Sequence, residues 1–91
     1  MPVTLEEAKI YLRVDTDDED ALIESFLQAA EDICEGVLRF PLADFEAVPE
    51  PVKQAVLYAT AQFYELRESI NINILTDIVR KLLFAYRKEG W

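Results

Sequence analysis

Residues 17–38 read DDEDALIESFLQAAEDICEGVL, and this stretch decides the fold. Its apolar side chains recur at spacings of three and four, which predicts one long amphipathic helix from Asp17 to about Leu38. Two adjoining rows form the apolar face: Leu22, Phe26, Ala29, Ile33 and Val37 make the first, and Ile23, Leu27, Ala30 and Cys34 make the second. A face this wide needs other helices packed on it.

Capping boxes predict where the first two helices begin. Thr4 and Glu7 form an S/T-x-x-E pair at the start of a helix expected from about Thr4 to Arg13, with Leu5, Ala8 and Leu12 facing inward. Thr16 and Glu19 form a second such pair before the long helix. The acidic residues Asp17 to Asp20 then lie in the first turn, where the helix dipole favours negative charge.

A proline-rich loop separates the long helix from the next one. Residues 40–51 contain three prolines and no sustained period, and we expect four of their apolar side chains to lie on the core or on a neighbour: Phe40, Leu42, Phe45 and Val48. Pro51 suits the first position of a third helix, which is predicted to run to about Glu68. Its inward stripe is Val52, Ala55, Val56, Ala59, Phe63 and Leu66.

Residues 69–75 alternate apolar and polar side chains with a period of two, which is typical of an extended segment. Such a segment either adds to a partner chain or forms a loop with its isoleucines turned inward. Thr76 is then expected to cap a last helix to about Lys88, with basic residues gathered towards its end. The apolar side of this helix is expected to be Ile78, Val79, Leu82, Leu83 and Tyr86.

Together these patterns predict a single all-α domain over residues 1–91. It is a small bundle of about four helices, with two long central helices and a short extended segment before the last helix. A hydrophobic content of 52% is rich for a free monomer of this length, which indicates that part of the apolar surface meets a partner.

The net charge of −9 is distributed unevenly. Residues 1–50 hold 14 acidic and three basic residues, whereas residues 51–91 hold four acidic and six basic residues. An acidic surface repels the phosphate backbone, so conventional nucleic-acid binding is not expected.

The residues that enzymes and cofactor sites need are largely missing. The chain has no histidine and only two glycines, so neither a Ser–His or Cys–His pair nor a glycine-rich phosphate loop is available. An EF-hand starting at Asp15 would need glycine at Asp20 and glutamate at Phe26. No enzymatic activity, metal or cofactor is therefore expected, and Cys34, the only cysteine, is interpreted as a buried apolar side chain.

No stretch of the sequence has the roughly 18 consecutive apolar residues of a membrane span, and the N-terminus lacks the pattern of a signal peptide. We expect no membrane partner. The protein is expected in the compartment where it is made, or inside a particle.

Three parts of the chain resemble the phage head–tail connector family, whose members are also described as DNA-packaging proteins. They are VTLEEAKIYLRVD with DDEDALI (residues 3–15 and 17–23), PVKQAVL leading to FYELRE (residues 51–57 and 63–68), and VRKLLFAYR (residues 79–87). The resemblance covers most of the chain and lies in the order and spacing of these strings. The isoleucine-rich residues 70–75 depart from it, because a turn with proline and glycine is expected there.

The resemblance implies a structural adaptor in the virion, assembled in the bacterial cytoplasm. It would form a ring of identical subunits beneath the portal protein, contact head-completion or tail proteins, and let DNA pass without specific binding. The residues expected at subunit or portal contacts are Tyr64, Arg67, Arg80, Tyr86, Arg87 and Trp91. The acidic residues expected to face the channel are Asp15, Asp17, Asp18, Glu19, Asp20, Glu24, Glu31 and Glu35.

Simpler interpretations remain for these residues: the tyrosines lie at the edge of the core, the arginines are solvated, and the acidic cluster caps a helix. The alternative function is an acidic regulatory module that mimics DNA and occupies the basic site of a nucleic-acid enzyme.

Overall fold

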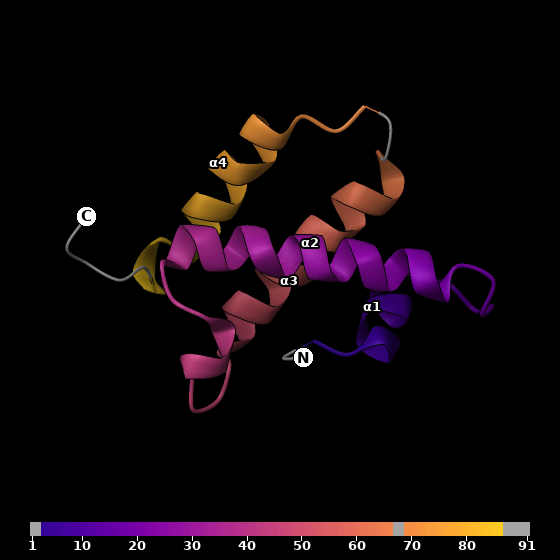
Figure 1. Ribbon diagram of the computed structural model, residues 1–91, viewed down its shortest axis with the longest axis horizontal. Coiled ribbons are helices and arrows are strands. Elements are labelled where there is room, and N and C mark those ends of the chain that lie inside the picture. The colour runs from indigo at the N-terminus through magenta and orange to yellow at the C-terminus, as the bar shows by residue number, and fades with distance from the viewer. Residues whose placement is uncertain (1–2, 67–68, 87–91) are drawn as a thin grey trace.

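The computed structural model describes residues 3–66 and 69–86, and within these ranges the chain is helical and contains no strand (Figure 1). The elements are α1 (Leu5–Leu12), α2 (Asp20–Leu38), the 3-10 helix η1 (Leu42–Asp44), α3 (Glu50–Glu65), α4 (Ile72–Leu83) and the 3-10 helix η2 (Phe84–Tyr86). The predicted all-α bundle with two long central helices is thus confirmed.

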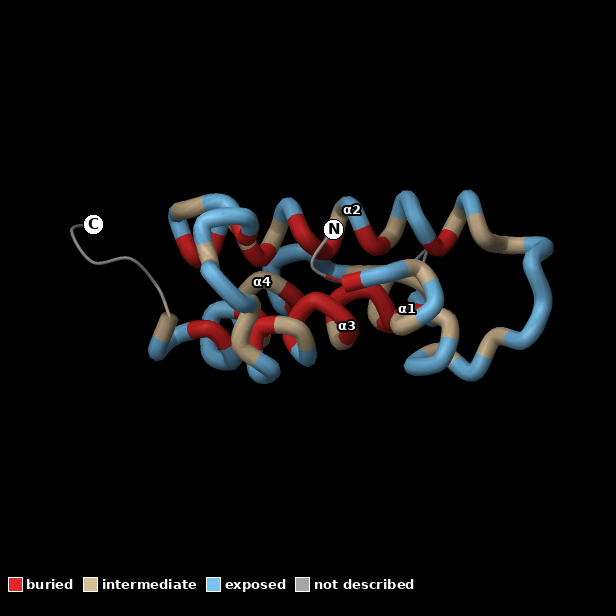
Figure 2. Tube along the Cα trace, turned by 90° about the horizontal axis from the view of Figure 1, so that it is seen from below, coloured by how far each residue is buried: buried red, intermediate tan, exposed pale blue. Residues whose placement is uncertain are grey.

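The two long helices cross, and the two shorter ones fill opposite angles of the crossing. Figure 1 shows α1 on one side of the α2–α3 pair and α4 on the other. In the perpendicular view, α2 lies above a layer in which α1 and α4 flank α3 (Figure 2). The buried residues line the space between these two layers, so α2 is the element that covers the core.

The face that α2 turns to the core is the second of its two predicted rows. In this row Ile23, Leu27, Ala30 and Cys34 are fully buried. In the first row Val37 is buried at the end of the helix, and the other four residues are only partly buried: Leu22, Phe26, Ala29 and Ile33. At the edge of the core the Phe26 ring stacks on Phe63 of α3, with 6.0 Å between ring centroids. On α3, the small buried residues Ala55 and Ala59 let the two helices approach closely.

The first predicted capping box is confirmed. The Thr4 hydroxyl accepts a hydrogen bond from the Glu7 backbone N–H at 3.1 Å, and the Thr4 backbone N–H donates to the Glu7 carboxylate at 3.1 Å. Arg13 then ends α1 in the left-handed conformation, with φ 62°.

The second predicted capping box is wrong. α2 begins at Asp20 rather than Asp17, and Glu19 stands at its N-cap without a side-chain cap hydrogen bond. Instead, the Glu19 carboxylate accepts a hydrogen bond from the Tyr64 hydroxyl at 2.5 Å. This contact ties α3 to the start of α2, so tertiary packing overrides the local capping pattern.

The loop after α2 folds back as expected. Leu42 is buried, and its backbone N–H donates a 2.7 Å hydrogen bond to the Glu35 carboxylate. Phe45 meets Phe40 edge to face, with 5.1 Å between centroids, and also meets Tyr86 at 6.4 Å. Val48 packs against the core as well. These contacts hold the loop on the end of the bundle.

The last helix begins one turn earlier than predicted. Asn71 is extended and its side chain accepts a hydrogen bond from the Ile74 backbone N–H at 3.1 Å, so residues 72–75 form the first turn of α4 and Thr76 lies inside it. Leu75, Val79 and Leu83 are buried at a spacing of four, which explains why residues 72–75 are helical rather than extended. The predicted extended segment over residues 69–75 is therefore wrong for the most part: Ser69 lies in a turn, residues 72–75 are helical, and Asn71 is extended as the N-cap.

Two helices end earlier in the sequence than predicted. α3 ends at Glu65, and α4 ends at Leu83 before η2. The predicted ends at Glu68 and Lys88 lie outside the described residues.

Candidate interaction surfaces

Part of the acidic segment before α2 is held by a lysine of α1. The Lys9 Nζ atom lies 2.8 Å from Asp17 Oδ1 and 2.8 Å from Asp20 Oδ1. The hydrogen bond from Lys9 lowers the pKa of the Asp17 carboxyl, and the bonds to Asp17 and Asp20 raise the pKa of the Lys9 ammonium. These two carboxylates therefore join α1 to α2, which sequence spacing did not indicate.

The predicted channel-facing acids divide into three groups. Asp15, Asp17, Asp18 and Glu24 are exposed to solvent. Glu19, Asp20 and Glu35 are half-buried and contact Tyr64, Lys9 and the Leu42 backbone respectively. Glu31 is only 5% exposed, so it cannot line an open channel, and that prediction is corrected. Within the first group Asp17 is bound to Lys9, so Asp15, Asp18 and Glu24 are the ones whose carboxylates stay fully available.

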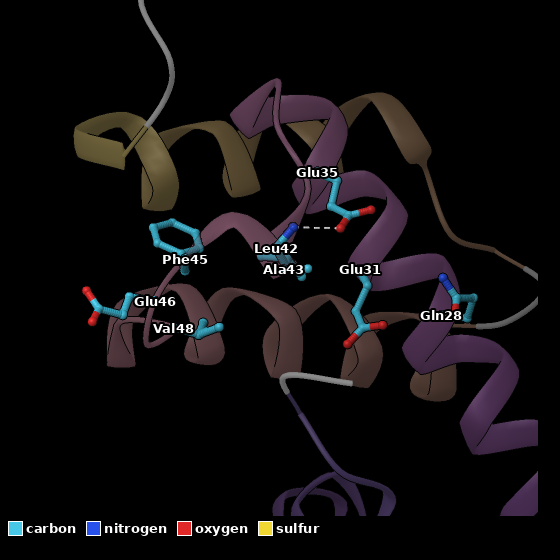
Figure 3. Close-up of a pocket in the computed structure, with 8 residues that line it drawn as sticks. All are labelled: Gln28, Glu31, Glu35, Leu42, Ala43, Phe45, Glu46 and Val48. Atoms are coloured by element: carbon cyan, nitrogen blue, oxygen red, sulfur yellow. Dashed lines mark hydrogen bonds between the residues drawn. The ribbon is translucent and has the colours of Figure 1, made fainter.

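Glu31 and Glu35 lie in a cleft between α2 and the loop that contains η1 (Figure 3). The cleft encloses about 400 Å³. Its lining residues are Gln28, Glu31, Glu35, Leu42, Ala43, Phe45, Glu46 and Val48. Burial raises the pKa of the Glu31 carboxyl, and its Oε2 atom has no hydrogen-bond partner among the described residues.

Large apolar side chains are exposed on the two flanking helices. On α1, Ile10 is 77% exposed and Tyr11 lies beside it. On and beside α4, Phe84 is 71% and Ile74 is 59% exposed, and Ile72 and Leu82 are also exposed. We call these the α1 face and the α4 face. Because α1 and α4 lie on opposite sides of the α2–α3 pair, the two faces are separate surfaces (Figure 1).

Each of these faces borders a shallow depression. On the α1 face, Ile10 and Tyr11 meet Leu57 of α3 around a space of about 240 Å³. On the α4 face, Ile74 meets Tyr58 and other residues around a space of about 230 Å³. The sequence pattern places Leu82 on the apolar side of the last helix and Ile74 in an extended segment, so it does not indicate these surfaces.

The predicted contact residues are not gathered on one surface. Tyr64 and Tyr86 are half-buried and contact Glu19 and Phe45, which favours the interpretation as core-edge side chains. Arg80 is exposed and pairs with Asp77 of the same helix at 2.8 Å. Their role in subunit or portal contacts stays a prediction. The other three predicted contacts, Arg67, Arg87 and Trp91, lie outside the described residues.

Within residues 3–66 and 69–86, no group of three His, Cys, Asp or Glu side chains is placed to hold a metal ion. In the same ranges, no helix combines the length and the apolar character that crossing a bilayer requires.

Most of the chain matches the sequence model of a known protein family. The sequence model described as phage gp6-like head-tail connector protein matches residues 2–88. No curated protein and no solved structure matches the chain. The matched range includes all four α-helices, the cleft and both apolar faces.

Proposed function

Because the chain belongs to the phage gp6-like head–tail connector family, we propose that it forms a ring of identical subunits in the head–tail joint of a virion. The ring sits beneath the portal protein and receives head-completion or tail proteins on its other side. DNA passes through it without specific binding. The family itself establishes the coarser role, that of a structural connector.

The pair of exposed apolar faces is the main observation that supports a ring. A closed ring uses a heterologous interface, so each subunit must present two different surfaces that fit one another. The α1 face carries Ile10 and Tyr11, and the α4 face carries Ile74 and Phe84 on the opposite side of the domain. Exposed apolar groups of this kind mark protein interaction sites. Contact of the α4 face with the α1 face of the next copy buries both.

The exposed acidic residues support the proposed path of DNA. Asp15, Asp17 and Asp18 lie in the loop before α2, and Glu24 lies in the first turns of α2. Placed on the inner wall of a ring, their carboxylates repel DNA phosphates and keep the moving duplex from adhering. Only these four of the predicted channel residues are assigned to that wall.

The native mass of the protein tests the ring. Light scattering across a range of concentrations, with the protein alone and with its portal protein, is expected to detect a large species, and electron microscopy is expected to show it as a ring. A protein that stays monomeric even with the portal refutes the proposal. If that monomer inhibited a DNA-binding enzyme in a salt-sensitive way, it would be a DNA mimic instead.

In a ring density map, the four exposed carboxylates are expected on the inner surface. Their position on the outer wall would refute the channel assignment while leaving the ring intact.

A further inference from the structure

The cleft between α2 and the η1 loop concentrates negative charge. Three of its eight lining residues, Glu31, Glu35 and Glu46, are acidic, and none of the eight is a cation. Apolar walls around such a cleft strengthen its field, because they lower the local dielectric constant. The cleft is therefore suited to a positively charged group.

Glu31 is the residue that most needs such a group. It is 5% exposed, and its Oε2 atom is buried without a hydrogen-bond partner among the described residues. A buried carboxylate with an unsatisfied oxygen is costly unless a cation or donor reaches it. Burial is the main cause of the raised pKa of this carboxyl, and the charge of the chain's own N-terminus and a hydrogen bond with the Val3 backbone oppose that shift only in part.

The shape of the cleft selects a long side chain over a bare ion. Leu42, Ala43, Phe45 and Val48 supply apolar surface along the cleft, and the carboxylates of α2 lie across from them (Figure 3). Lysine has this double character, because its methylene stem packs on apolar surface while its ammonium stays polar. A metal would need a closer set of ligands than the described residues provide.

We propose that this cleft receives the Lys81 side chain of a neighbouring copy of the chain, an inference that rests on the proposed ring. Lys81 is exposed in the last turns of α4. By contrast, Lys9 is bound to Asp17 and Asp20, and Lys53 lies 3.4 Å from Glu7 of its own chain. Lys81 forms no ion pair within the described residues, so it is available to a second copy.

The first test measures binding of a lysine analogue to the cleft. The chain carrying Lys81→Met is titrated with Nα-acetyl-lysine amide, and the methyl NMR signals of Ala43 and Val48 are followed. Saturable shifts are expected with this probe and not with the uncharged Nα-acetyl-norleucine amide. Adding Glu31→Gln is expected to weaken binding by about tenfold or more, since a charge-assisted contact is lost.

Glu24→Gln is the matched control, because Glu24 is an exposed carboxylate on the same helix outside the cleft. It is expected to leave binding unchanged. Equal shifts with the norleucine probe, or full affinity in the Glu31→Gln chain, would overturn the assignment of the cleft.

The second test identifies the occupant. Equal amounts of ¹⁴N- and ¹⁵N-labelled chains are assembled and treated with a zero-length carbodiimide, which joins a lysine amine to a carboxylate. A mixed-isotope peptide linking Lys81 to Glu46 or Glu31 is expected, and it should vanish with Lys81→Met. Rings without this link, or a link from the cleft to a portal lysine, overturn the inference and leave the ring standing. Failure to assemble at all overturns both.

Discussion

Substitution of Phe84 is expected to weaken the association of subunits without changing the stability of the fold. An aromatic side chain buries about 150–250 Å² when covered, and Phe84 is 71% exposed at the end of α4. At about 25 cal/mol per Å², and taking the lower end of that area, covering the exposed part in an interface stabilises association by about 3 kcal/mol. Phe84→Ser is therefore expected to weaken association of two subunits by about 150-fold.

The same substitution is expected to leave the fold nearly unchanged. Replacing an exposed residue typically alters the free energy of unfolding by less than about 0.5 kcal/mol. Sedimentation velocity measures association and thermal unfolding measures stability, with Phe84→Leu as a variant that keeps apolar contact and Glu24→Ser as an exposed control on α2. Unchanged association in Phe84→Ser would refute the α4 face as an interface. A loss of stability equal to the loss of association would show that Phe84 serves the fold instead.

Three further substitutions test other parts of the structure. Gly36→Ala is expected to raise the free energy of unfolding by about 0.5–1 kcal/mol, because Gly36 lies within α2 and an added Cβ meets nothing within 4 Å. Chemical denaturation measures this free energy, and a destabilised variant would contradict the prediction. Asn71→Ala is expected to cost about 1 kcal/mol by removing the cap of α4, whereas an equal loss on Asn73→Ala would show that capping is not the cause. Glu31→Gln is expected to stabilise the protein at pH 7. The pKa of Glu31 is raised above its ordinary value of 4.5 in the folded state, so the folded chain binds more protons and wild-type stability falls as pH rises through this window. The gain in melting temperature from Glu31→Gln should thus shrink towards pH 4, and a gain that is independent of pH would point to a cause other than charge.

The fold was largely predictable because its signals are local and repeated. The period of α2, the Thr4–Glu7 box and Pro51 each predicted an element that the structure contains. The errors arose where a distant residue competes with a local pattern. Glu19 bonds to Tyr64 rather than to its own helix start, and Leu75 joins the core with Val79, which turns an alternating segment into helix.

The interaction surfaces were less predictable, for a geometric reason. A helix pattern shows that a side chain is apolar, yet it does not show which of two adjoining rows faces the core. Thus the helical pattern places Leu82 on the inner side of the last helix although it is exposed, and it does not show that Glu31 is buried. Only the packing of α1 and α4 around the central pair decides these positions. The family resemblance, by contrast, was carried by the order of the strings and is confirmed over residues 2–88.

Cys34 gives this protein an internal reporter of its own opening. It is the only cysteine, it is fully buried in α2, and burial raises the pKa of its thiol to about 12. At neutral pH the thiol is therefore protonated and shielded, and an aromatic disulfide reagent reaches it only when α2 lifts away from α3 and α4. Each labelling event then counts one such excursion in the unaltered sequence. Comparing the labelling rate of free subunits with that of assembled ones measures how much the joint restrains the motion of each member.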